Sequence, residues 1–229
     1  MLSRADAQDS RSSGIAVRLQ MFGPLGLVAV AAILAGSLVA PIVGAVLVIL
    51  WAHVAELPLR FLGFIRPRSW PLTLAGGAAF GVVFKLVMKA FVMPLLGAPA
   101  VNATYHYLAG NAGAMPGMIA MIFVSASFGE EVLFRGYLFE RLGRLFGTSR
   151  AARAGTILLS SALFAAAHYH GQGVPGVEQA AITGLVIGAI YASWSEIWIV
   201  MVVHAAFDLT AVALIYWGVE EAVAHVVFY

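Results

Sequence analysis

The stretch that decides the fold class is MFGPLGLVAVAAILAGSLVAPIVGAVLVILWA, which runs from Met21 to Ala52 without one charged residue. Across the 229 residues, 62% are hydrophobic and 10% are charged, whereas soluble domains carry about 25% charged residues. Long apolar runs are typical of membrane helices rather than of a β-barrel, whose strands alternate over short segments. The composition excludes a disordered protein, a nucleic-acid-binding domain and an ordinary soluble enzyme, and it predicts an all-α polytopic integral membrane protein.

The first apolar run is too long for one ordinary span. A single helix over these 32 residues would measure about 48 Å, well beyond a hydrocarbon core of ~30 Å. Two short helices that turn near Gly36 and Ser37, or at Pro41, would leave the arginines before and after the run on the same side of the membrane. We therefore prefer two helices, with one long kinked helix as the alternative.

The rest of the chain supplies the other spans. We expect them at about 72–96, 115–142, 154–170, 180–194 and 197–217, with turns at 171–176 and 195–196. The predicted fold is thus a bundle of six to seven transmembrane helices, eight at most, with its active site inside the membrane. Residues 1–20 are expected to be a mobile polar tail, 21–217 a single membrane domain with a motif core at 125–208, and 218–229 a short C-terminal tail.

Ionisable side chains inside the predicted spans are candidates for function, because burying them in lipid costs free energy. Counted from the arginine-rich inner ends of the spans, Glu130 lies about 16 Å deep and His168 about 22 Å deep. His204 and Asp208 lie at about 12 and 18 Å on another span. Three helices therefore bring acids and imidazoles to similar depths, and we expect water and substrate to reach them from the cytoplasmic side. Lys85 belongs to no such group, and we interpret it as snorkelling to the interface or packing against a cavity.

The spacing within each helix also indicates pairs. Glu131 and Arg135 are four residues apart, so they share a helix face and can form an ion pair, while Glu130 points elsewhere. His204 and Asp208 have the same spacing, so one can orient the other.

Three motifs occur in order: EEVLFR from Glu130 to Arg135, FAAAH from Phe164 to His168, and HAAFD from His204 to Asp208. Together they resemble the CPBP family (CAAX prenyl proteases and bacteriocin-processing or Abi proteins) of intramembrane endopeptidases, which carries EExxxR, FxxxH and HxxxN/D on successive membrane helices. The resemblance covers somewhat over a third of the chain.

The resemblance implies a role for each residue. Glu130 and His168 would activate a water molecule, Glu131 and Arg135 would hold the first motif in shape, and His204 with position 208 would stabilise the oxyanion. Relatives often carry Asn, a hydrogen-bond donor, at the last position, whereas an ionised Asp208 can only accept hydrogen bonds. Asp208 must therefore be protonated, orient His204 or bind a metal.

Two catalytic types stay open for such a site. We favour glutamate-based hydrolysis without a cofactor, and the alternative is a zinc site made of Glu130, His168, His204 and Asp208. Other intramembrane proteases fit poorly, because the chain has no Cys, no HExxH motif and no second membrane aspartate beside Asp208.

The expected partners are the lipid bilayer and a hydrophobic or lipidated peptide or protein, with no nucleic acid. The expected location is the bacterial inner membrane, with the N-terminus in the cytoplasm. Two other functions stay open: a proton-coupled transporter that uses the same acid and imidazole layer, and a non-catalytic membrane scaffold or immunity protein.

Overall fold

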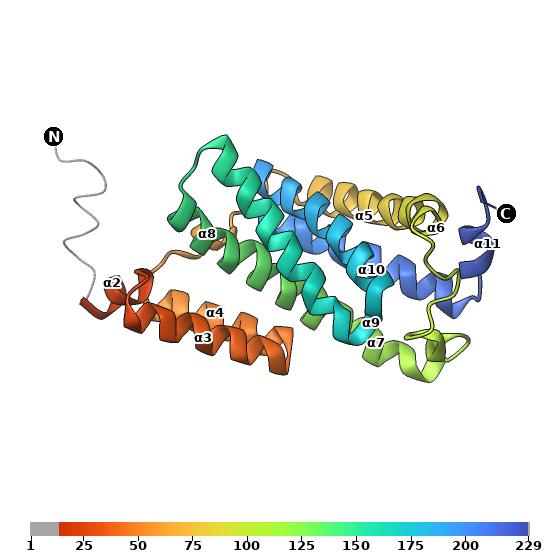
Figure 1. Cartoon of the computed structure of the whole chain (residues 1–229), viewed down its shortest axis with the longest axis horizontal. Helices are drawn as coiled ribbons and strands as arrows, with labels where there is room; N and C mark the ends of the chain where they lie inside the picture. The colour runs from red at the N-terminus through yellow and green to blue at the C-terminus, as the bar shows by residue number, and fades with distance from the viewer. Residues whose placement is uncertain (1–13, 229) are drawn as a thin grey trace.

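The computed structural model describes residues 14–228, and all the secondary structure in this range is helical (Figure 1). The α-helices are α2 (Gly14–Gln20), α3 (Pro24–Val39), α4 (Pro41–Val54), α5 (Trp70–Val87), α6 (Met93–Leu95), α7 (Met115–Met121), α8 (Phe139–Phe146), α9 (Arg150–Trp194), α10 (Ile197–Tyr216) and α11 (Glu220–Ala224). Short 3-10 turns are η1 (Leu59–Leu62), η3 (His106–Leu108) and η4 (Ala112–Ala114), and π-helical segments are η2 (Met88–Val92), η5 (Ile122–Glu130) and η6 (Val132–Leu138).

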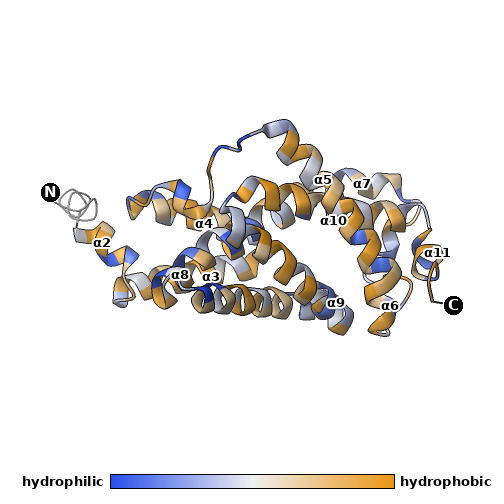
Figure 2. Ribbon diagram, turned by 90° about the horizontal axis from the view of Figure 1, so that it is seen from above, coloured by the Kyte–Doolittle hydropathy of each residue, from blue (hydrophilic) through white to orange (hydrophobic). Residues whose placement is uncertain are grey.

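Within the described range, four helical stretches are long and apolar enough to cross a membrane: 70–95, 112–146, 150–194 and 197–216. Hydrophobic residues dominate these helices in Figure 2. The chain is therefore an integral membrane protein, while the count of six to seven spans stays a prediction.

The first apolar run forms two helices, as predicted. Ala40 has an extended backbone (φ −163°, ψ 143°) between α3 and α4, and Pro41 begins α4 at a position where its missing N–H costs nothing. The two helices run side by side as a hairpin (Figure 1). They contain 16 and 14 residues, so each is about 21–24 Å long and short for a full span.

Helix α9 consists of two antiparallel arms joined at Gly173. The backbone there (φ 63°, ψ −159°) lies in a region that only glycine adopts readily, and Pro175 follows in the first turn of the second arm. The predicted turn at 171–176 is confirmed. The second predicted turn is confirmed too, because Ser195 is left-handed (φ 54°) between α9 and α10.

The helix that carries the first motif is continuous from α7 to α8 but contains two π-helical segments, η5 and η6. A π-helical turn bonds residue i to i+5, and such turns occur mostly at functional sites. Ser127 in η5 donates a hydrogen bond to the carbonyl of Met201 in α10 (2.8 Å), which holds this helix against α10.

The predicted terminal tails are partly helical. Residues 1–13 lie outside the described residues, but 14–20 form α2, whose last residue Gln20 donates from its amide group to the carbonyl of Ala55. Arg141 also donates to the carbonyl of Gln20. At the other terminus, α11 buries Glu220 against Lys89 (3.3 Å). Polar contacts thus connect both segments to the rest of the bundle, and the division into tails and one membrane domain stays a prediction.

The bundle has two chemically different ends. Helix α2, residues 55–69 and α8 lie at one end of the bundle, which we call the arginine end. Every described arginine except Arg135 lies in these segments or in the first turn of α9. The opposite end, which we call the loop end, is formed by α6, residues 97–114, α11 and the bend of α9 (Figure 1). The main buried apolar cluster, with Leu62, Tyr137 and Ile197 among its members, fills the bundle toward the arginine end.

Candidate functional site

The structure brings all four predicted catalytic residues to one cavity. Glu130, His168, His204 and Asp208 line a space of about 300 Å³, which we call the central cavity. They come from three helices that small residues allow to approach closely. Gly129 lies against the start of α4, where an added Cβ would stand 2.9 Å from the backbone of Ile42.

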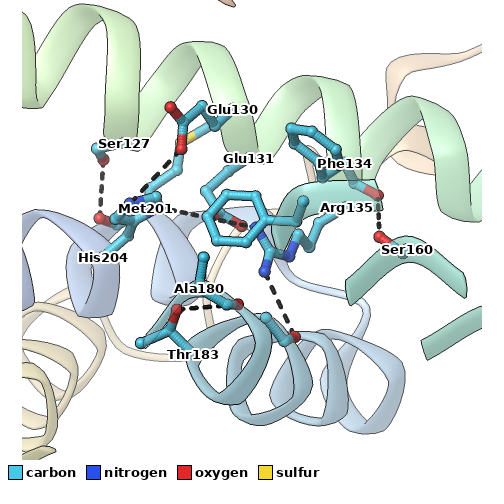
Figure 3. A network of polar contacts seen from close by, with 12 residues as sticks. Ser127, Glu130, Glu131, Phe134, Arg135, Ser160, Ala180, Thr183, Met201 and His204 are labelled. Carbon is cyan, nitrogen blue, oxygen red and sulfur yellow. Dashed lines mark hydrogen bonds and ion pairs between the residues drawn. The ribbon is translucent and has the colours of Figure 1, made fainter. Parts of the chain in front are cut away.

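Glu131, Arg135 and His204 form a buried polar cluster beneath this cavity (Figure 3). Arg135 donates to Glu131 Oε1 at 2.9 Å, and the side chains are 1% and 0% exposed. The same carboxylate oxygen accepts from His204 Nδ1 at 2.6 Å. Arg135 also donates to the carbonyl of Gly184 in the second arm of α9 (3.4 Å). The predicted pair of Glu131 and Arg135 is thus present, and it is tied to two further helices.

The bond between Glu131 and His204 sets the orientation of the imidazole. Because Nδ1 donates its proton to a carboxylate, Nε2 points to the opposite side of the ring. There it faces Asp208 at 3.5 Å and Glu130 at 3.8 Å. A ring nitrogen placed between two carboxyl groups requires a proton on the ring or on an acid. His204 Nε2 and the carboxyl groups of Asp208 and Glu130 are therefore close enough to share exchangeable protons.

Exposure increases along this set of side chains. The Glu131 side chain is 0% exposed, His204 8%, Glu130 17% and Asp208 29%. Glu130 Oε2 is itself buried and makes no hydrogen bond with any described group. Glu130 is thus the carboxylate that combines contact with the cavity and an unused acceptor atom.

His168 approaches the cavity from the first arm of α9. Its Nδ1 lies 2.8 Å from the carbonyl of Phe164, so Nδ1 carries the proton and Nε2 is the free, basic nitrogen. The Phe164 ring lies between the second and third motifs, with its centroid 4.6 Å from that of His168 and 6.1 Å from that of His204. Arg135 stacks on the same ring at 4.7 Å. The four-residue spacing within FAAAH thus places an aromatic ring in contact with both His168 and the guanidinium of Arg135.

The central cavity extends toward the loop end. Its lining includes Asn102, Tyr105 and Gln172, whereas buried apolar side chains close the arginine end. Burial raises the pKa of Tyr105, so its phenol stays neutral at the mouth of the cavity. The charge argument that places the arginines in the cytoplasm puts the loop end on the other side. Access from the cytoplasmic side therefore stays a prediction, because it depends on the membrane orientation of the chain.

Sequence reasoning missed part of the lining. Lys85, for which packing against a cavity was one of two interpretations, lines the central cavity and donates to Gln179 (2.8 Å) on the second arm of α9. A lysine inside a span is a signal in itself, but no motif connected it with the other residues. Tyr105, Gln172 and Gln179 gave no signal, because single uncharged polar residues are common at helix ends.

The side chains do not present a ready metal site. Among residues 14–228, no group of three or more His, Asp or Glu residues is arranged to hold a metal ion. His204 and His168 both use Nδ1 in a hydrogen bond, to Glu131 and to a carbonyl, and this leaves Nε2 of each ring available. The zinc alternative therefore stays a prediction, and we derive no chemical step from it.

The comparisons with known proteins agree with the motifs. Residues 112–210 match the family model described as type II CAAX prenyl endopeptidase Rce1-like, and this confirms the resemblance to the CPBP family. The matched range contains all three motifs. No curated protein and no solved structure matches the chain.

Proposed function

We propose, from the premise that residues 112–210 form an Rce1-like type II CAAX prenyl endopeptidase domain, that this protein is an intramembrane endopeptidase. It hydrolyses a peptide bond of a hydrophobic or lipidated substrate by glutamate-based catalysis. The observation that carries the proposal is the central cavity, where an unbonded carboxylate oxygen of Glu130 faces His204 and shares the lining with His168.

Each residue has a role that follows from its position. Glu130, supported by the free Nε2 of His168, takes a proton from water as the water oxygen bonds to the carbonyl carbon. His204 donates from Nε2 to the developing oxyanion, with the Glu131 bond holding the ring in place. When the carbon–nitrogen bond breaks, the proton held by Glu130 goes to the leaving amine. Asp208 lies 3.5 Å from His204 Nε2 and attracts the ring electrostatically when the ring is protonated and the acid is ionised.

The protein is proposed to lie in a bacterial inner membrane with its N-terminus in the cytoplasm. This orientation keeps the arginine end inside, as positively charged flanks favour. The central cavity then faces the outer side, so the expected substrates are exported or membrane-inserted peptides.

Cleavage profiling by mass spectrometry tests the proposal. Detergent-purified wild type, Glu130→Gln and Glu178→Gln are incubated with a pool of lipidated and apolar peptides, with and without a metal chelator. Glu178 lines neither cavity and serves as a matched control on the neighbouring helix. The expected result is a set of products that Glu178→Gln retains, Glu130→Gln loses and the chelator leaves unchanged.

Other outcomes have definite meanings. Products that persist in Glu130→Gln contradict the assignment of the base. Products that disappear with the chelator contradict glutamate-based catalysis. No product from any peptide, together with substrate-dependent proton movement in liposomes, supports the transporter instead.

A further inference from the structure

A second cavity adjoins the central cavity at the loop end. It measures about 160 Å³ and we call it the loop-end cavity. The two spaces adjoin across a wall of six residues that line both: Lys85, Asn102, Gln172, Gln179, Ala211 and Ile215. Lys85 is the charged residue of this shared wall.

Lys85 is a buried cation that forms no ion pair with an acid of the described residues. The residue is 7% exposed, and its ammonium group makes one hydrogen bond, to the neutral amide of Gln179. It also stands 4.7 Å from the centroid of the Phe207 ring. None of the ion pairs among residues 14–228 includes Lys85. An ammonium group has three donors, so this one keeps unused capacity for an anion.

Lys89, one turn further along the same helix, is a lysine whose ammonium group does form an ion pair. Its ammonium group pairs with Glu220 at 3.3 Å and also donates to the carbonyl of Ala100. Glu220 in turn accepts from the backbone N–H of Asn102 (3.2 Å). Among the described residues, Lys89 thus has an acid within ion-pair distance, whereas Asp208, the acid whose charge acts most on Lys85, forms no ion pair with it.

We propose that Lys85 binds a carboxylate of the substrate peptide and so sets the cleavage position. This inference rests on the proposed function. A peptide held at Glu130 and continuing toward the loop end brings its next residues to Lys85, where the space is limited. A carboxylate there pairs with the ammonium group and satisfies its free donors. The carboxylate is that of the C-terminus or of an acidic side chain close to it.

Three forms of one peptide distinguish a C-terminal carboxylate from an acidic side chain as the group that binds Lys85. One peptide cleaved by the wild type is prepared with a free C-terminal carboxylate, with a C-terminal amide, and as the amide with Asp in place of Asn near the end. Initial rates are measured for wild type, Lys85→Met, Lys85→Arg and Lys89→Met. A charge-assisted hydrogen bond predicts that the wild type prefers one carboxylate form over the plain amide by about 10- to 100-fold in kcat/KM.

The preference has to follow the charge at position 85. It is expected to fall to about one in Lys85→Met, to return in Lys85→Arg, and to persist in Lys89→Met. The peptide form that the wild type prefers identifies the source of the carboxylate. Equal rates for all three peptides, or a preference that survives in Lys85→Met, overturn this inference while leaving the peptidase activity intact. No cleavage of any peptide by the wild type overturns the proposed function as well.

Discussion

Glu130 and Glu131 are sequence neighbours, but substitutions at the two positions are expected to change stability by very different amounts. In Glu131→Gln, the buried guanidinium of Arg135 loses the carboxylate that lies 2.9 Å away, and His204 loses its acceptor at 2.6 Å. Removing one partner of a buried ion pair costs about 3–5 kcal/mol, because the other charge is left uncompensated. In Glu130→Gln no hydrogen bond is lost, since the nearest described partner, His204 Nε2, is 3.8 Å away. We therefore expect a change in stability below about 1 kcal/mol for that variant.

Reversible unfolding in mixed micelles measures both values. Wild type, Glu130→Gln and Glu131→Gln are titrated with a denaturing detergent, and helix content is followed by circular dichroism. The expected result is a large loss of stability for Glu131→Gln alone, although both variants lose peptidase activity. If both lose stability equally, or if Glu131→Gln is as stable as the wild type, the separation into a structural and a catalytic glutamate is refuted.

Two further predictions concern the bend and the orientation. Gly173→Ala is expected to lower the free energy of unfolding by about 1–3 kcal/mol, because the φ and ψ of this residue suit only glycine. Gly171→Ala serves as the control in the same unfolding assay, since Gly171 has open space around it and ordinary helical geometry. Equal effects of the two substitutions would contradict the bend. Because the chain has no Cys, single cysteines at Ala112 (loop end) and Thr148 (arginine end) can be labelled selectively. An impermeant maleimide added to intact cells is expected to label position 112 and to reach position 148 only after lysis, and the reverse pattern would contradict the orientation.

Much of this architecture follows from local sequence patterns. The four-residue spacings correctly predicted the Glu131–Arg135 pair and the proximity of His204 to Asp208, because side chains at i and i+4 meet on any regular helix. The breaks at Ala40 and Gly173 were near predicted turns, because Pro and Gly limit helix geometry locally.

Contacts between distant segments could not be predicted in the same way. The bond between Glu131 and His204 spans 73 residues and depends on how each helix is rotated about its axis. The π-helical turns of η5 and η6 change that rotation, and hydrophobic periodicity does not reveal them in a uniformly apolar sequence. For the same reason, the sequence did not show that Tyr105, Gln172 and Gln179 join the lining of the central cavity.

The central claim is that Glu130 is the base of a peptidase rather than a structural acid. The most direct measurement is the initial rate of cleavage of one identified peptide by wild type, Glu130→Gln and Glu178→Gln, each shown to be folded by circular dichroism. Loss of a general base predicts a fall in kcat of about 10²- to 10⁴-fold for Glu130→Gln, with Glu178→Gln close to the wild type. A folded Glu130→Gln that cleaves within a few-fold of the wild-type rate would contradict the account.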